Sequence, residues 1–284
     1  MIRIQAHAKL NFELRVGSRR DDGFHSISGR FQSIAVSDEI SVQFSDDDVL
    51  GSMRGGPVPD PDHNLAWRAV EAVRRAVETS QALEVLLDKV IPVAAGLGGG
   101  SADCAAALIA SQRLLGASDE TIAALAPTLG SDVPFCLTGG YAHVSGRGDQ
   151  VEQLPAELGY ALAVVVPPVD LSTPAVYKKW DELGEPLGPA INVRSVPTAM
   201  RDETFRNDLV PAAVALSPAV GQWQAELRAR WGREVLMSGS GPSLFAFCLD
   251  MEEARDMVDA IPVGARFAEA TQPVAIGWLI LDDA

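Results

Sequence analysis

Hydrophobic and polar residues alternate without a break from residue 2 to residue 16. The apolar positions are Ile2, Ile4, Ala6, Ala8, Leu10, Phe12, Leu14 and Val16, and every residue between them is polar. A period of two over this length predicts a β-strand with one buried face. Lys9 and Asn11 lie on its other face, roughly 6–7 Å apart at about 3.3 Å per residue. From the strand alone, a solvated outer face is the favoured interpretation of these two residues.

The remainder of the first half predicts a mixture of strands and helices. We expect a loop over 17–29, strands over about 30–50 and a loop over 51–62. A helix over 64–79 follows, because its apolar residues recur at helical spacing. We then expect a strand over 83–91, helices over 102–115 and 119–129, and strands up to residue 151.

The second half begins with a continuous apolar run at 161–166, which is typical of a buried strand. A helix over 173–183 and a proline-containing, loop-rich segment over 184–206 are expected next. A helix over 211–231, a strand–turn–strand unit over 234–250, a helix over 251–260 and a strand over 274–281 complete the chain. A domain boundary near 150–160 is consistent with this order.

A glycine-rich segment separates the run that ends at Ile91 from the helix that begins near Ala102. Residues 96–101 read Gly-Leu-Gly-Gly-Gly-Ser. Glycines allow the backbone N–H groups to turn toward a ligand, and the start of the following helix adds unpaired N–H groups and partial positive charge. This combination favours a phosphate cradle. The segment matches neither a P-loop nor a dinucleotide-binding fingerprint, and a purely structural turn is the alternative.

A second short segment, residues 130–135, reads Gly-Ser-Asp-Val-Pro-Phe. Ser131 is a candidate helix N-cap, and Pro134 is tolerated in a first helical turn. Asp132 then lies at the positive end of the helix. Compensation of the helix dipole explains this carboxylate without any catalytic role.

Composition excludes several classes of function. The 23 Lys and Arg against 38 Asp and Glu give a net charge of −15, which argues against nucleic-acid binding. The three cysteines are an odd number without metal-ligand spacing, so free thiols and a cytoplasmic location are expected. The four histidines are scattered, and we predict no zinc site. No stretch is apolar enough to predict a membrane span.

Four ordered motifs together resemble the GHMP kinases (galactose, homoserine, mevalonate and phosphomevalonate kinases). The motifs are Ala-Lys-Leu-Asn at 8–11, Pro92 with the glycine-rich segment 96–101, Asp-Val-Pro-Phe at 132–135, and Ser-Gly-Ser-Gly-Pro at 238–242. Within that superfamily the chain is most similar to the 4-diphosphocytidyl-2-C-methyl-D-erythritol kinases. Residues 19–25, Arg-Arg-Asp-Asp-Gly-Phe-His, and the segments 64–65, 146–149 and 207–209 also resemble that family.

Several positions depart from the family pattern. His7 stands where proline is usual, Phe24 replaces tyrosine, Ala102 replaces a second serine after the glycines, and Asp149 replaces glutamate. Phe24 retains an aromatic ring for stacking but has no phenol hydroxyl. Ala102 removes a second hydroxyl that could contact phosphate or metal.

The resemblance implies an α+β, two-lobed GHMP kinase fold. Its N-terminal lobe is similar to domain 2 of ribosomal protein S5, and its C-terminal lobe is ferredoxin-like. We expect an ATP-binding domain over residues 1–155 and a second domain over residues 156–284, with the active site between them. The chain is expected to act as a monomer or weak homodimer.

The implied reaction moves the γ-phosphoryl group of ATP, with Mg²⁺, onto the 2-hydroxyl of 4-diphosphocytidyl-2-C-methyl-D-erythritol, in the non-mevalonate route to isoprenoid precursors. Lys9 and Asp132 are the implied catalytic residues. The implied nucleotide-binding residues are Asn64, Pro92, Gly96, Leu97, Gly98, Gly99, Gly100 and Ser101. The acceptor, a cytidine diphosphate-linked methylerythritol, is implied to contact Asn11, Phe24, His25, Asp132 and Tyr177. Ser101 is a candidate for Mg²⁺, but no metal ligand set is assigned.

Two other functions remain open at this point. The chain could be another GHMP kinase that acts on homoserine or mevalonate, although the Gly-Phe-His segment at 23–25 argues against it. It could also be a non-catalytic nucleotide-binding relative, which the presence of Lys9, Ser101 and Asp132 disfavours. For Tyr177, packing of an amphipathic helix between the lobes is an alternative to acceptor binding.

Overall fold

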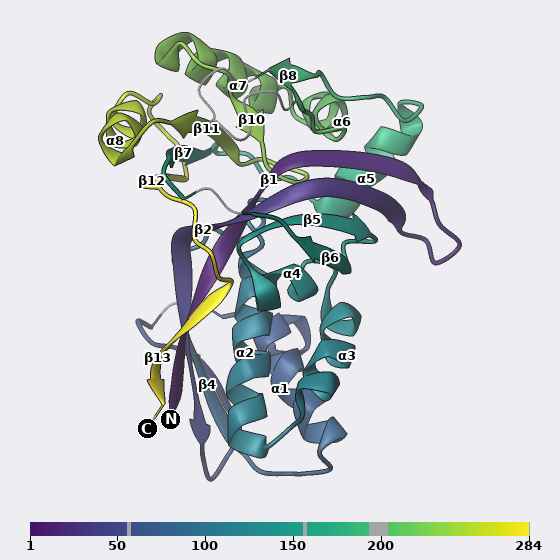
Figure 1. Ribbon diagram of the computed structural model, residues 1–284, viewed down its shortest axis with the longest axis vertical. Helices are drawn as coiled ribbons and strands as arrows, with labels where there is room; N and C mark the ends of the chain where they lie inside the picture. Colours follow the sequence, from purple (N-terminus) through teal and green to yellow (C-terminus); the bar gives the residue numbers. More distant parts are fainter. Residues whose placement is uncertain (56–57, 156–157, 193–203, 284) are drawn as a thin grey trace.

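A computed structural model describes residues 1–55, 58–155, 158–192 and 204–283 of the chain. Figure 1 shows two lobes, with a large sheet and helices α1–α4 in one and a small sheet with α5–α8 in the other. The long strands β1 and β2 extend from the first lobe to the second. This arrangement confirms the expected α+β fold class.

Seven strands among the described residues form the large sheet. Its central pair is antiparallel, β1 (Ile2–Arg19) with β2 (His25–Phe44). The C-terminal end of β2, residues 39–44, pairs with β4 (Leu83–Asp88), and β3 (Val49–Ser52) lies parallel to β4. The N-terminal part of β2, residues 27–32, pairs with β5 (Tyr141–Gly146), which pairs with β6 (Gln150–Gln153). The last strand, β13 (Trp278–Asp283), pairs with β1 at the sheet edge.

The first-lobe helices stand together beside the sheet (Figure 1). They are α1 (Leu65–Ala76), α2 (Gly99–Leu115), α3 (Asp119–Leu129) and α4 (Val133–Thr138), and a short 3₁₀ helix (Pro61–His63) precedes α1. Helix α2 is buried along most of its length, and its buried face consists mainly of alanine. Small side chains allow it to pack closely against β1 and β2, which places its N-terminus beside the middle of β1.

The second lobe has a four-stranded sheet in the order β10–β11–β7–β12. These strands are β10 (Leu236–Met237), β11 (Leu244–Cys248), β7 (Ala161–Val166) and β12 (Phe267–Thr271). The helices are α5 (Thr173–Glu182), α6 (Val210–Leu216), α7 (Pro218–Trp231) and α8 (Met251–Asp259). A two-stranded unit pairs β8 (Ile191–Asn192) with β9 (Thr204–Phe205).

An aromatic cluster joins the lobes at Phe12 of β1. The ring centroid of Phe12 is 4.9 Å from that of Phe247 and 5.7 Å from that of Phe245, both in β11. Phe205 meets the same ring edge-on at 6.4 Å. Because these rings are fully buried, the apolar side of β1 anchors the second lobe. The polar residues Lys9 and Asn11 are thereby held at the junction of the lobes.

Most of the predicted elements are confirmed, with several differences. The expected loop over 17–29 is largely strand, because β1 runs to Arg19 and β2 starts at His25. The expected helix over 211–231 is two helices, since α6 ends at Leu216 and Pro218 starts α7. Strand β12 was not expected.

The domain boundary at residue 155 stays a prediction. Strand β13, which that division assigns to the second domain, pairs with β1 in the large sheet. Of the segment expected to be loop-rich, 184–206, residues 193–203 lie outside the described part of the chain.

Candidate active site

A cavity of about 950 Å³ lies between the lobes. It is bounded by β1, the glycine-rich segment, the starts of α1, α2 and α4, helix α5, and the turn at 239–240. Every site residue expected from the sequence lines it: Lys9, Asn11, Phe24, His25, Asn64, Pro92, Gly96, Leu97, Gly98, Gly99, Gly100, Ser101, Asp132 and Tyr177. The fold therefore brings residues from six separate segments to one space.

Two glycines of the cradle are required by the backbone and by close contacts. Gly96 (φ +80°) approaches the second lobe so closely that a Cβ there would lie 2.6 Å from the carbonyl oxygen of Ser238. Gly98 (φ +71°) is the N-cap of α2, and a Cβ there would lie 2.8 Å from Cγ of Lys9. Positive φ disfavours other residues at both positions. The turn thus brings backbone N–H groups to the cavity beside Lys9.

The next two glycines differ in their surroundings. A Cβ at Gly99 would meet Cγ2 of Ile91 at 2.8 Å, inside the protein. A Cβ at Gly100 would have only Leu65 within 4 Å, at 3.6 Å, so this glycine opens onto the cavity. The first N–H groups of α2 have no partner within the helix, and they carry its partial positive charge. This end of the cavity fits the phosphates of a nucleotide.

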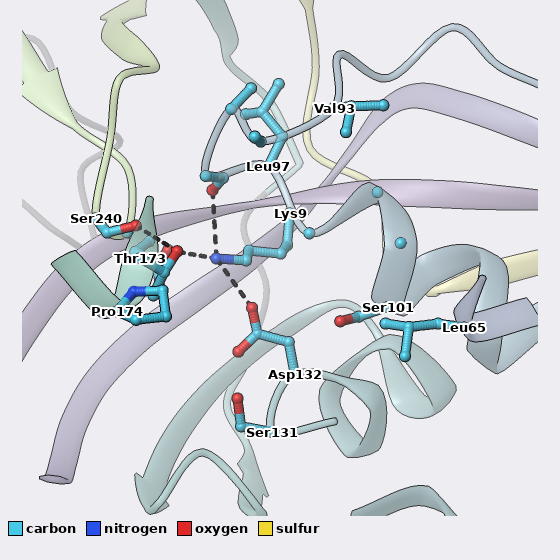
Figure 2. Close-up of a pocket in the computed structure, with 18 of the residues that line it drawn as sticks. Lys9, Leu65, Val93, Leu97, Ser101, Ser131, Asp132, Thr173, Pro174 and Ser240 are labelled. Atoms are coloured by element: carbon cyan, nitrogen blue, oxygen red, sulfur yellow. Dashed lines mark hydrogen bonds and ion pairs between the residues drawn. The ribbon is translucent and has the colours of Figure 1, made fainter. Parts of the chain in front are cut away.

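Lys9 is the buried charge at the centre of the site (Figure 2). Its Nζ donates to Oδ1 of Asn11 at 2.6 Å and to the carbonyl oxygen of Gly96 at 3.3 Å. It also lies 3.2 Å from Oδ2 of Asp132, and its side chain is only 5% exposed. The solvated outer face, which the strand alone favoured, is therefore wrong, because the glycine-rich segment and Asp132 cover Lys9, and Ser238 of the second lobe contacts Asn11.

Asp132 occupies the N-cap position of α4, so Ser131 is not the cap. The Asp132 carboxylate turns toward Lys9 instead of capping the helix, and it is 25% exposed. Figure 2 shows the Ser101 hydroxyl and the Asp132 carboxylate pointing into the same space. Asp132 therefore presents a carboxylate to the cavity while it remains paired with a buried cation.

The far end of the cavity is aromatic. The ring of His25 stacks on Tyr177 with centroids 5.4 Å apart and an interplanar angle of 24°. His25 is held by the carbonyl of Gly17 at 3.1 Å through Nδ1 and by Asp181 at 3.2 Å through Nε2. Burial raises the pKa of Tyr177, and the negative charge of Asp132 adds to this effect. The phenol is thus neutral and offers a flat surface.

Phe24 lies at the rim of the same end. Its side chain is 53% exposed, and the guanidinium of Arg147 lies 5.6 Å from the ring centroid. Arg147 is itself held by Asp149, whose Oδ1 accepts the Arg147 backbone N–H at 3.0 Å. Asp149 therefore braces its turn. Phe24 is available to a ligand that enters between the lobes.

Asn64 caps helix α1. Its Oδ1 accepts the backbone N–H groups of Ala66 at 3.0 Å and Trp67 at 3.2 Å. The residue nevertheless lines the cavity with Pro92, beside the glycine-rich segment. Capping explains the position of Asn64, which is buried where α1 begins.

The sequence reasoning did not identify a buried charge cluster beneath the cradle. Lys89 pairs with both Asp38 and Asp103, and Lys89 and Asp103 line the cavity. Burial raises the pKa of Asp103 to about 7, and its Oδ1 has no partner among the described residues. Burial opposes the charge of Lys89, but the charges of Asp103 and Asp38 outweigh it and raise the Lys89 pKa. The only sequence feature that could have indicated this cluster is the position of Lys89, just before the cradle.

Two hydroxyl groups from different segments of the second lobe were also missed. Oγ1 of Thr173 and Oγ of Ser240 lie 2.8 Å apart at the cavity wall (Figure 2). Ser240 belongs to the 238–242 motif, so the sequence marked this position without giving it a role. The exposed Lys178 lies at the same wall.

The described residues contain no group of three or more His, Cys, Asp or Glu side chains that could hold a metal ion. The hydroxyl of Ser101 and the carboxylate of Asp132 are oxygen donors facing the cradle, of the kind that Mg²⁺ accepts. A Mg²⁺ ion held mainly by phosphates and water fits this donor set. None of the helices in the described ranges has the length and apolar character needed to cross a membrane.

Comparisons with known proteins give a consistent result. The family model of the GHMP kinases N terminal domain matches residues 64–140. The 4-diphosphocytidyl-2-C-methyl-D-erythritol kinase of Corynebacterium efficiens is 40% identical over 96% of this chain and 94% of that protein. The enzyme of the same name from Streptomyces coelicolor is 33% identical over 99% of both.

Solved structures agree with the sequence relatives. A crystal structure of 4-(cytidine 5'-diphospho)-2C-methyl-D-erythritol kinase superposes with a TM-score of 0.80 and 33% identity, covering 95% of this chain and 98% of that one. A homoserine kinase from Cytophaga hutchinsonii superposes with a TM-score of 0.71 at 18% identity, over 99% and 97% of the two chains. The latter likeness concerns the fold alone.

Proposed function

The chain belongs to the GHMP kinases and, within them, to the family of the 4-diphosphocytidyl-2-C-methyl-D-erythritol kinases, and we propose that it phosphorylates the 2-hydroxyl of that substrate with ATP. The observation that carries the proposal is the content of one cavity. A glycine cradle, a buried Lys9–Asp132 pair and an aromatic His25–Tyr177 stack line the same space. The cradle fits the phosphates of ATP, the Lys9–Asp132 pair fits the acceptor hydroxyl, and the aromatic stack fits the cytidine base.

Phosphoryl transfer depends mainly on positioning and on the neutralisation of charge. In the proposal, backbone N–H groups at Gly98–Ser101 bind the β- and γ-phosphates, and Ser101 adds a hydroxyl. Asn64 and Pro92 border the nucleotide. Mg²⁺, when bound, would neutralise phosphate charge, and Ser101 and Asp132 would be the protein groups able to hold it. The net charge of −15 makes these local donors necessary, because the general field repels anions.

Asp132 accepts the proton of the acceptor hydroxyl in this proposal. The acceptor oxygen forms its bond to the γ-phosphorus as the bond to the bridging oxygen breaks and ADP leaves. Lys9, fixed by Asn11 and Gly96, stabilises the negative charge that develops on the acceptor oxygen. The buried position of Lys9 strengthens this interaction, because few water molecules screen it.

The cytidine end of the acceptor is assigned to the aromatic part of the cavity. Tyr177 and Phe24 supply surfaces for stacking, and His25 supplies a polar edge. Stacking of a base on an aromatic side chain contributes about 1–3 kcal/mol. Asn11 borders the polyol end beside Lys9. None of these aromatic groups is required for phosphoryl transfer itself, so they support a base-containing acceptor.

The proposal extends to the setting of the reaction. We propose a monomer or weak homodimer that acts on small molecules in the cytoplasm, in the non-mevalonate route to isoprenoid precursors. The three cysteines are free and buried, which is consistent with a reducing compartment. The strongly negative charge supports the exclusion of nucleic acid as a partner.

Measurement of ADP release tests the proposal. The protein is incubated with ATP and Mg²⁺ and, in separate reactions, with 4-diphosphocytidyl-2-C-methyl-D-erythritol, homoserine or mevalonate. Acceptor-dependent ADP release with the first compound alone supports the proposal. Release with homoserine or mevalonate instead would assign the chain to another GHMP activity, and nucleotide binding without turnover on any acceptor would identify a non-catalytic relative.

A further inference from the structure

Asn207 is a buried amide whose hydrogen bonds link β1 to the serine–glycine turn, defined here as residues 238–242. Its Nδ2 donates to the carbonyl oxygens of Met237 at 2.9 Å and Gly239 at 2.7 Å. Its Oδ1 accepts the N–H of Leu209 at 2.9 Å. Its backbone forms a parallel bridge with Leu14 of β1. Both hydrogens of the amide are thus used to fix the start of the turn relative to β1.

The serine–glycine turn in turn contacts the groups that hold Lys9. Oγ of Ser238 accepts the N–H of Asn11 at 3.1 Å and donates to the carbonyl oxygen of Gly96 at 2.9 Å. Asn11 and Gly96 provide two of the oxygens that accept from Nζ of Lys9. A Cβ at Gly239 would lie 3.1 Å from Oδ1 of Asn11 and 3.5 Å from Nζ of Lys9. A shift of this turn therefore moves the ligands of the ammonium group.

The neighbouring Asp208 makes a contrasting set of contacts. Its carboxylate accepts the N–H groups of Val16 at 3.1 Å and Gly188 at 2.8 Å, and it pairs with Arg206 at 2.9 Å. These bonds fix the same segment to the outer part of β1, away from the serine–glycine turn. Asp208 thus supports the fold as Asn207 does, without a contact to the groups around Lys9.

We infer that Asn207 is a positioning residue for the proposed phosphoryl transfer, acting on Lys9 through Ser238 and Gly239. This inference rests on the proposed function, because Lys9 matters only if its charge stabilises the reacting oxygen. Asn207 itself does not line the cavity. It sets the location of the Lys9 ammonium, and small displacements of a catalytic group cost much rate.

The direct test is Asn207→Asp, with Asp208→Asn as the matched control. Asn207→Asp keeps an acceptor for Leu209 but replaces the amide donor by an oxygen that faces two carbonyl oxygens. We expect kcat to fall about tenfold or more while the KM for ATP changes little. Asp208→Asn should lower the melting temperature by a comparable amount and leave kcat close to that of the wild type. Equal losses of kcat in the two variants would overturn the inference.

A double-mutant cycle with Lys9→Ala tests the route through Lys9. If Asn207 acts through Lys9, Asn207→Asp lowers kcat much less in the Lys9→Ala background than in the wild type. If the wild type turns over the acceptor but the losses are additive, the inference is overturned while the proposed function stands. A wild type without acceptor-dependent turnover would instead contradict the proposed function.

A spectroscopic readout is independent of turnover. Nitrogen-15 NMR detects lysine ammonium groups that hydrogen bonds protect from exchange with water, and the Lys9 signal is identified by its loss in Lys9→Ala. We expect this signal in the wild type and in Asp208→Asn, and its broadening or loss in Asn207→Asp. An unchanged Lys9 signal in a folded Asn207→Asp variant would contradict the positioning role directly.

Discussion

The ammonium of Lys9 and the carboxylate of Asp132 lie 3.2 Å apart, and they differ in their access to solvent. Lys9 is 5% exposed and Asp132 is 25% exposed. The cation is therefore held inside the protein by fixed partners, while the carboxylate remains accessible from the cavity. This arrangement allows Asp132 to contact a hydroxyl of a bound substrate without leaving Lys9.

We expect Asp132→Asn to lower kcat strongly and to leave ATP affinity nearly unchanged. The amide keeps the size of the side chain but cannot accept a proton, and a general base typically contributes about 10²–10⁴-fold. Steady-state kinetics and nucleotide titration measure the two quantities. A decrease of less than roughly tenfold in kcat would remove Asp132 from the assigned role.

We expect Gly100→Val to abolish nucleotide binding in a folded protein. The position opens onto the cavity, with its nearest neighbour at 3.6 Å, so the valine side chain would occupy phosphate space without disturbing the core. Gly99→Val is a poorer probe, because its Cβ would collide with Ile91. Calorimetric titration with ATP is the measurement, with circular dichroism as the control for folding. Wild-type affinity in folded Gly100→Val would show that phosphates do not bind there.

Tyr177→Ala should raise the KM for the acceptor and spare the KM for ATP. The substitution removes the ring that stacks on His25, at the end of the cavity away from the cradle. Tyr177→Phe is the matched control, since it keeps the ring, and it should behave like the wild type. If Tyr177→Ala changed the melting temperature but neither KM, Tyr177 would be a packing residue of α5.

The raised pKa of Asp103 predicts a pH dependence of stability. The carboxyl has its ordinary pKa of 3.8 when unfolded and a pKa of about 7 when folded, because burial disfavours the charge. Between these values the folded state retains a proton that the unfolded state has lost, so the contribution of Asp103 to stability decreases as pH rises. The free energy of unfolding of Asp103→Asn, relative to wild type, should therefore increase from pH 4 to pH 7.5. A constant difference across this range would show that Asp103 is ionised throughout.

The glycine-rich segment, the strand over residues 2–16 and the Asp132 segment could be predicted from sequence because each carries a local signal. Alternation, consecutive glycines and a proline placed in a first helical turn depend on neighbouring residues only, although the cap itself is Asp132 and not Ser131. Their assembly into one site was suggested by a family resemblance, since contacts such as Lys9 with Asp132 join segments that are far apart in the chain.

Other features depend on tertiary contacts and were not predictable locally. The polar face of β1 looked as if it met solvent, but Lys9 and Asn11 are buried beneath the glycine-rich segment and the turn at 238–239. Residues 25–29 read as loop, yet they pair with both β1 and β5. Lys89, Asp38 and Asp103 come from three separate segments, and no local pattern indicates that they form a buried cluster. In each case the partner comes from a remote segment.

The central claim is that the cavity selects an acceptor by its cytidine group, and it is tested most directly by comparing two acceptors. The specificity constants kcat/KM for 4-diphosphocytidyl-2-C-methyl-D-erythritol and for the same polyol phosphate without cytidine are measured with saturating ATP and Mg²⁺. Loss of a stacked base and its hydrogen bonds predicts a decrease on the order of 10³-fold. Equal specificity constants for the two acceptors would contradict the assignment of the aromatic end of the cavity to cytidine.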